Sequence, residues 1–162
     1  MLSACHARIE HQCSTLRRLV PHLLSHGSDA EARDAAVNVM RYFDTSARHH
    51  HADEENDLFP VLMESMAGSD AVCVRELTED LAREHRELEA RWQRLRSALE
   101  RVVIGERVSL EPHDVEALVT LYERHIEREE GELLPMAARL LSDADLDRVG
   151  RAMRERRRIE TG

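Results

Sequence analysis

Two segments of the sequence carry the same pair of metal-binding side chains. Residues 50–60 read HHADEENDLFP, and residues 125–135 read HIEREEGELLP. In both, a His is followed four residues later by a Glu: His50 by Glu54, and His125 by Glu129. Residues four apart lie on one face of an α-helix, one turn apart. Each segment therefore points an imidazole nitrogen and a carboxylate in one direction, an arrangement that can bind a transition metal.

The similarity of the two segments extends beyond these pairs. Each Glu is followed directly by another, Glu55 or Glu130, and each segment ends in a proline, Pro60 or Pro135. The additional glutamates are rotated by about 100° around the helix, so we expect them to support ligands rather than to bind metal. A proline inside a helix removes a backbone donor and bends the chain, so both helices should kink just past the site. The repeat also indicates two related helical hairpins.

Another inward-facing histidine is expected on the helix between the two segments. His85 interrupts an otherwise apolar line that includes Leu81, Leu88 and Trp92. The spacing places His85 on the same helix face as these apolar residues. We therefore expect its imidazole to point into the bundle.

The first helix offers a choice between two histidines. His6 precedes Ile9 by three residues and Cys13 by seven, so it lies on the apolar face. His11 lies about 160° from Cys13, on the outer face. We therefore choose His6 as the ligand. Similar reasoning places three other histidines toward solvent or at the periphery: His49, His51 and His113.

A single inward-facing histidine is usually an ordinary core residue. Here the sequence places several inward histidines and two inward carboxylates at matched positions along the helices. A buried carboxylate without a partner costs several kcal/mol, and a bundle keeps such groups where a cation offsets that cost. The pattern therefore favours a metal site over a purely structural role.

The expected ligands are His6, His50, Glu54, His85, His125 and Glu129. Imidazole and carboxylate together suit iron, manganese or zinc, and this set exceeds what one tetrahedral zinc ion needs. Two octahedral ions have about twelve coordination positions in total. The histidines, two bridging glutamates and a bridging oxo or hydroxo group leave roughly two positions for a small ligand. We expect two iron ions, with manganese or zinc as alternatives.

The elements that position these residues are helices. Leu, Ala, Glu and Arg are abundant, and aromatic residues make up only 3% of the chain. Ser28 and Glu31 form a capping-box pattern at the start of the second helix. Helix-stop signals separate five segments, at about residues 2–24, 28–66, 70–103, 112–141 and 143–159. We expect an all-α, up-down-up-down four-helix bundle over about residues 2–141, with an additional short C-terminal helix, in one domain of residues 1–162.

The overall composition argues against several classes of protein. The net charge of −9 disfavours general nucleic-acid binding, which needs a basic surface. No apolar run reaches the roughly 18 residues that a membrane span needs, and the N-terminus lacks an apolar signal region. The cysteines fit no zinc motif. We expect a cytoplasmic protein with reduced, buried or partly buried thiols and with no nucleic-acid or membrane partner.

The sequence resembles a known family. The resemblance rests on H-x-x-x-E-E-x-x-L-F-P at His50, H-x-x-x-E-E-x-x-L-L-P at His125, the pair Glu84-His85 and a leading His6. These features are similar to bacterial hemerythrin-like proteins of the HHE cation-binding type, over about residues 2–140. The resemblance implies a four-helix bundle around a histidine-rich, carboxylate-bridged di-iron site, and it implies the same ligand set.

Two departures separate this chain from the oxygen-carrying hemerythrins. Those proteins have a further histidine one turn before the position of His85, where this chain has Leu81. They also end in a His and an Asp five apart, whereas His125 and Glu129 are four apart. A site with one nitrogen fewer has more open coordination, so reversible oxygen carriage is not the only chemistry that the resemblance allows.

Three functions follow from such a site. The first is a non-haem di-iron protein that binds or senses dioxygen, or that senses iron or redox state. The second is a di-iron enzyme that acts on peroxide or nitric oxide. The third is a metal-binding structural bundle without redox chemistry.

Two further features carry hypotheses. Tyr122 lies one turn before His125, and its hydroxyl could hydrogen-bond a small ligand at the open position; a core tyrosine is the alternative. The last helix is rich in arginine. We interpret it as a solvated helix that braces the bundle, with an acidic partner as the alternative.

Overall fold

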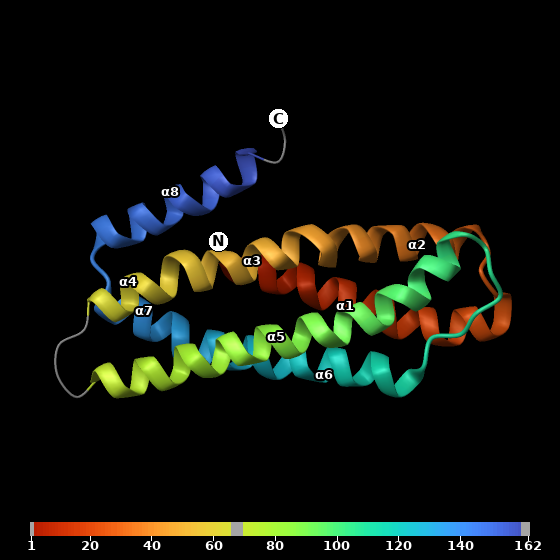
Figure 1. The fold of residues 1–162 in the computed structure, drawn as a ribbon, viewed down its shortest axis with the longest axis horizontal. Helices are drawn as coiled ribbons and strands as arrows, with labels where there is room; N and C mark the ends of the chain where they lie inside the picture. The colour runs from red at the N-terminus through yellow and green to blue at the C-terminus, as the bar shows by residue number, and fades with distance from the viewer. Residues whose placement is uncertain (1, 66–69, 160–162) are drawn as a thin grey trace. The chain divides into compact units, whose positions relative to one another are not determined.

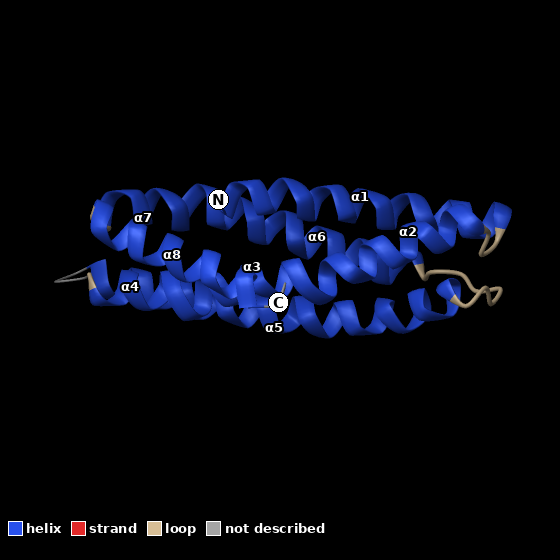
Figure 2. Cartoon of the chain, turned by 90° about the horizontal axis from the view of Figure 1, so that it is seen from above, coloured by secondary structure: helices blue, strands red, loops and turns tan. Residues whose placement is uncertain are grey.

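The computed structural model describes residues 2–65 and 70–159. Figure 2 shows these residues as helices joined by loops, without a strand. The prediction of an all-α protein is therefore confirmed for the described part of the chain. None of the helices searched within it combines the length and the apolar character that crossing a lipid bilayer requires.

The helices form five continuous stretches, close to the five predicted segments. The first is α1 (Leu2–His26), the third is α5 (Asp70–Val103) and the fifth is α8 (Asp143–Ile159). The second stretch consists of α2 (Ala30–Arg41), η1 (Tyr42–Ser46), α3 (Ala47–Asp53), η2 (Glu54–Leu58) and α4 (Phe59–Glu64). The fourth consists of α6 (Pro112–Arg128), η3 (Glu129–Leu133) and α7 (Leu134–Leu140). The η segments are wider, π-helical turns within otherwise α-helical stretches.

The wide turns η2 and η3 lie directly before the prolines at which the kinks were predicted. The residue before each proline donates its backbone N–H five residues back: Phe59 to Glu54, and Leu134 to Glu129. In a regular α-helix a proline ring collides with the carbonyl four residues before it. We attribute the wider turn to relief of this collision. Both wide turns begin at the predicted glutamate ligands, Glu54 and Glu129, and end before the prolines.

The second stretch begins differently from the predicted capping box. Asp29 is the N-cap residue of α2, and its carboxylate accepts the backbone N–H of Ala32 at 2.8 Å. The hydroxyl of Ser28 instead donates to the backbone carbonyl of Glu106 at 2.5 Å. The prediction of Ser28 as the cap is therefore wrong. Asp caps a helix as well as Ser does. Asp29 can therefore cap α2 while the Ser28 hydroxyl donates to another acceptor.

The described residues belong to two compact units. Unit 1 comprises residues 1–47 and 86–124, and unit 2 comprises residues 48–85 and 125–162. The all-α prediction holds in each unit, whereas the up-down-up-down order and the single domain stay predictions. Among the cysteines, Cys5 and Cys13 are buried as predicted, but Cys73 is exposed.

Unit 1 contains a cluster of aromatic rings, one of which also makes a hydrogen bond to a carboxylate. Helices α1 and α2 pack against each other. The ring of Phe43 lies 4.8 Å from that of Trp92 and 5.5 Å from that of Tyr122, measured between centroids. The indole N–H of Trp92 donates to Asp44 at 2.9 Å, and Arg96 pairs with the same carboxylate. The tryptophan thus buries its ring and keeps a partner for its polar edge.

In unit 2, α8 lies along the wide turn η2. It runs antiparallel to the η2–α4 segment, because Arg148 pairs with Glu64 and Arg156, two turns later, pairs with Asp57. Figure 1 shows this helix in dark blue, turning back beside α4 and α3. Val149 and Met153 are buried on one face of α8. The predicted C-terminal helix is thus present and packs on the part of the chain that carries the first His–Glu pair.

Candidate metal centre

Unit 2 contains five of the six predicted ligands. Each comes from a different helical element, and all are almost completely buried. They are His50 on α3, Glu54 on η2, His85 on α5, His125 on α6 and Glu129 on η3. The two carboxylates and His50 have an exposed fraction of 0%. Glutamates are rarely buried in this way unless something compensates their charge.

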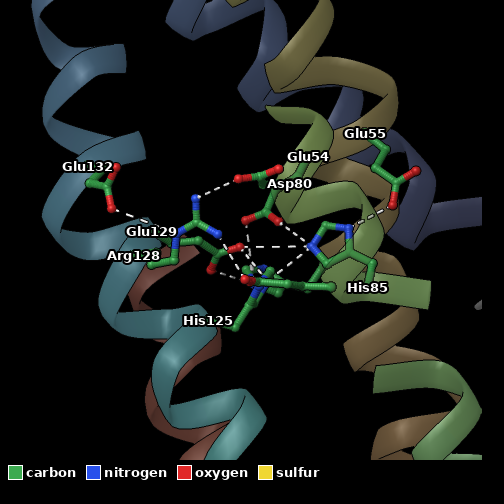
Figure 3. Close-up of polar contacts among 10 residues, drawn as sticks. Glu54, Glu55, Asp80, His85, His125, Arg128, Glu129 and Glu132 are labelled. Carbon is green, nitrogen blue, oxygen red and sulfur yellow. Dashed lines mark hydrogen bonds and ion pairs between the residues drawn. The ribbon is translucent and has the colours of Figure 1, made fainter. Parts of the chain in front are cut away.

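Each of the two carboxylates has imidazoles on both sides, so that its two oxygens face different histidines. Glu54 places Oε1 3.5 Å from Nε2 of His50 and Oε2 3.2 Å from Nε2 of His85. Glu129 places Oε2 3.6 Å from Nε2 of His50 and Oε1 2.7 Å from Nε2 of His125. The Nε2 atoms of His85 and His125 are themselves only 3.1 Å apart. Each glutamate therefore turns one oxygen toward His50 and the other toward the His85–His125 pair. Figure 3 shows Glu54 and Glu129 beside His85 and His125.

These residues fit a metal site. Both oxygens of Glu54 are buried and accept no hydrogen bond of good geometry from the described residues. A buried carboxylate in this state costs several kcal/mol, and a cation bound by these oxygens would offset that cost. One oxygen or nitrogen atom from each of Glu54, His85, His125 and Glu129 can be chosen so that all four lie within 4.8 Å of one another. The mixture of imidazole and carboxylate is one that iron, manganese and zinc accept.

Two carboxylates outside this group orient the imidazoles. Nδ1 of His85 lies 2.6 Å from Glu55, and Nδ1 of His125 lies 2.7 Å from Glu84. Glu84 also accepts from Arg128 at 2.8 Å. A carboxylate that accepts the Nδ1 proton leaves the Nε2 lone pair available for a metal. Once neutral, both histidines are therefore held in the tautomer that metal binding requires.

The structure places the two predicted supporting glutamates in different surroundings. Glu55 contacts His85, whereas the side chain of Glu130 is exposed. Glu84 was not predicted as a partner of His125. The two residues are 41 positions apart, and spacing along one helix carries no information about which side chain of another helix lies opposite.

His51 is the histidine that the sequence reasoning misplaced. It was predicted to face solvent or the periphery, but its side chain is half-buried and its Nε2 atom is fully buried. Its ring stacks on His85, with centroids 4.1 Å apart and an interplanar angle of 14°. The prediction assumed one regular helix, whereas α3 lies between two wide turns that change the helical phase. The buried Ala47, four residues earlier, was the available signal, because residues four apart share a face.

Two predicted residues belong to unit 1. His6 on α1 is buried, with an exposed fraction of 3%, and His11 on the same helix is exposed. This difference in burial agrees with the prediction that His6 lies on the apolar face of the helix and His11 on the outer face. The role of His6 as a ligand stays a prediction. Tyr122 is also buried, against the ring of Phe43. Its hydrogen bond to a small ligand likewise stays a prediction.

Without a cation, protons compensate the buried carboxylates. Burial alone would lower the pKa of His85, but its contacts with Glu129, Glu54 and Glu55 outweigh burial and raise the pKa to about 9. Burial also opposes the charged form of His125, yet Glu129 and Glu84 raise its pKa. Burial raises the pKa of Glu54. At neutral pH the metal-free site therefore holds His85 as a cation.

We expect metal affinity to increase with pH between about 6 and 9. Below its pKa of about 9, His85 carries a proton that a metal must displace, so each pH unit gained should raise the affinity by up to about tenfold per displaced proton. Calorimetric titration in buffers with different ionisation enthalpies measures the protons released. Glu55→Gln should shift the steep part of the curve to lower pH, because it removes a carboxylate that raises the pKa of His85. An affinity independent of pH would contradict this description of the metal-free site.

Comparison with known proteins shows a family and a relative that this chain resembles. A family model described as the hemerythrin HHE cation binding domain matches residues 1–137. A protein of Haemophilus influenzae (strain KW20 / Rd), described as an uncharacterized protein, is 31% identical to this chain over 160 residues. That match covers 99% of this chain and 90% of the relative. The range matched by the family model includes all six predicted ligands and ends before α8.

Proposed function

Since the chain belongs to the hemerythrin HHE cation-binding family, we propose that it holds two iron ions and uses them to bind or sense dioxygen, or to sense iron or redox state. The observation that carries this proposal is the orientation of the two buried carboxylates. Glu54 and Glu129 each direct one oxygen toward His50 and the other toward His85 or His125. Carboxylates oriented in this way can bridge two cations, whereas one cation would need one oxygen from each.

The proposed ligand set is His6, His50, Glu54, His85, His125 and Glu129, with an oxo or hydroxo bridge between the ions. Iron is favoured because a centre with nitrogen and oxygen ligands and open positions supports redox chemistry with small ligands. Manganese and zinc accept the same donor atoms. Metal analysis of the purified protein distinguishes these three, and zinc as the native metal would remove the redox function from the proposal.

The reaction chemistry would come from the metals: two ferrous ions can each supply one electron to a small oxidant such as dioxygen. The protein contributes a site shielded from water, since the ligands in unit 2 are buried. It also contributes fixed imidazole tautomers, through Glu55 at His85 and Glu84 at His125. Leu81, one turn before His85, is fully buried and offers no ligand atom, which leaves room in the coordination for a small molecule.

A di-iron enzyme that acts on peroxide or nitric oxide is the second candidate function. The apolar side chain at Leu81 favours it, because a site with one nitrogen fewer keeps more positions for a reacting molecule. A metal-binding structural bundle without redox chemistry is the third.

Oxygen cycling separates these functions. The iron-loaded protein is reduced without oxygen, exposed to oxygen and returned to an inert atmosphere while its absorption spectrum is followed. A spectral change that reverses on oxygen removal supports binding or sensing. Irreversible oxidation together with catalytic consumption of added peroxide or nitric oxide supports the enzyme. A spectrum that does not respond to either treatment would contradict both redox functions.

A further inference from the structure

We propose that His51 is an additional metal ligand, which binds the same cation as His85 and His125. This inference rests on the proposed function, because it concerns the composition of that metal centre. It adds to the predicted ligand set a residue on α3, directly after the expected ligand His50.

The geometry of three imidazoles supports this assignment. His51, His85 and His125 come from α3, α5 and α6, and each offers a nitrogen within 4.8 Å of the nitrogens offered by the other two. The ring of His51 is parallel to that of His85 and nearly perpendicular to that of His125, with the latter centroids 6.0 Å apart. Nitrogen atoms from three helices thus converge on one small region of unit 2.

The burial of His51 Nε2 has a chemical consequence. A solvent-facing histidine would direct its nitrogens to water, whereas this nitrogen is fully buried beside two other imidazoles. A cation that accepts a lone pair from each of the three imidazoles uses all three nitrogens at once, and imidazole is a preferred ligand of iron, zinc and related metals.

A ring that only fills space is the competing explanation. Stacking on His85 could hold His51 in place without any metal contact, as aromatic rings do in many cores. His51→Phe separates the two explanations, because phenylalanine keeps a ring that can stack on His85 and removes both nitrogens. A structural role predicts that this variant is equivalent to the native protein, whereas a ligand role predicts weaker metal binding.

The inference also alters the expected openness of the centre. With His51 bound, one of the roughly two positions that the six-ligand count leaves open is filled by a protein nitrogen. A small ligand would then have about one position available to it. His51 would in this way restrict which small molecules can bind and how they bind.

The test uses cobalt(II), which accepts the same imidazole and carboxylate ligands as ferrous iron and is less easily oxidised by air. Native protein, His51→Phe and a control, His113→Phe, are stripped of metal and titrated. His113 is exposed on α6, so its variant should match the native protein. We expect His51→Phe to bind one of its two cobalt ions at least about tenfold more weakly. In the fully loaded protein it should also lack one of the strongly shifted imidazole N–H resonances in the proton NMR spectrum.

The outcomes separate the inference from the proposed function. If the native protein binds no cobalt, the proposed function fails first. If the native protein and His51→Phe bind two ions with equal affinity and show the same number of shifted resonances, the function stands and the inference is overturned. Should His51→Phe fold poorly by circular dichroism, His51→Gln is titrated instead. Its weaker binding supports the inference, and unchanged binding overturns it.

Discussion

Replacing Glu54 by Gln is expected to abolish tight metal binding while leaving the metal-free protein at least as stable as the native one. Glutamine has the shape of glutamate without its charge, so it cannot bridge two cations. Loss of a metal-bound carboxylate should weaken binding by about 100-fold or more, since even partners of ligands contribute about 10- to 100-fold. Metal titration of the stripped protein measures this loss.

The stability of the same variant should change in the opposite direction. Burial raises the pKa of Glu54 above its ordinary value. The ionised carboxylate therefore disfavours the folded metal-free state once the pH exceeds the ordinary pKa of glutamate, near 4.5. Without metal, Glu54→Gln should therefore raise the free energy of unfolding at neutral pH, because it removes the pH-dependent cost of the ionised carboxylate; urea denaturation measures the change.

The control for this variant is Glu130→Gln, which changes an exposed glutamate in the other segment. It should affect neither metal affinity nor stability by more than about 0.5 kcal/mol. Glu129→Gln should reproduce the loss of metal. Retention of both metals by Glu54→Gln would exclude a bridging role. A large loss of stability in the metal-free variant would show that this carboxylate is a structural group.

The double substitution Arg156→Ala/Arg157→Ala is expected to destabilise the protein by about 3 kcal/mol. Asp53 is completely buried, and both arginines of α8 donate to it, Arg157 at 2.5 Å. Removal of both cations leaves a buried carboxylate without its charge partners, which is the costly way to break such a contact. The estimate lies at the low end of the usual range because the arginine side chains are 23% and 33% exposed. Urea denaturation of the metal-free protein measures the change.

Two further variants test the cause of this effect. Arg154→Ala, on an exposed position of the same helix, should change stability by less than about 0.5 kcal/mol. Adding Asp53→Asn to the double variant should restore part of the lost stability, because it removes the uncompensated buried charge. If Arg154→Ala destabilises as strongly as the double variant, the general helicity of α8 and not the contact with Asp53 is responsible.

Local spacing predicted most of the side chains that come together in the candidate metal centre. The four-residue interval in both segments identified His50, Glu54, His125 and Glu129, because residues one turn apart in a helix share a face. The interruption of an apolar line identified His85 by the same argument. The positions of five helical stretches also followed from stop signals and apolar periodicity, which are properties of short stretches of chain.

The features that escaped prediction depend on irregular backbone or on distant residues. His51 was misplaced because α3 is flanked by wide turns, whereas the phase argument assumed a regular helix throughout. The contact of Arg157 with Asp53 joins residues 104 positions apart, so no local pattern indicates it. Asp29 replaced Ser28 as a cap because the serine hydroxyl found an acceptor on a loop far along the chain.

The central claim is a centre of two metals bridged by two carboxylates, and iron titration with Mössbauer spectroscopy tests it most directly. Metal-free protein is titrated with ferrous iron without oxygen, and the product is oxidised and measured at low temperature. We expect about two iron ions per chain, with the oxidised pair coupled antiferromagnetically and therefore diamagnetic at low temperature. Uptake of less than about one iron per chain, or a single uncoupled ferric site, would contradict the bridged centre.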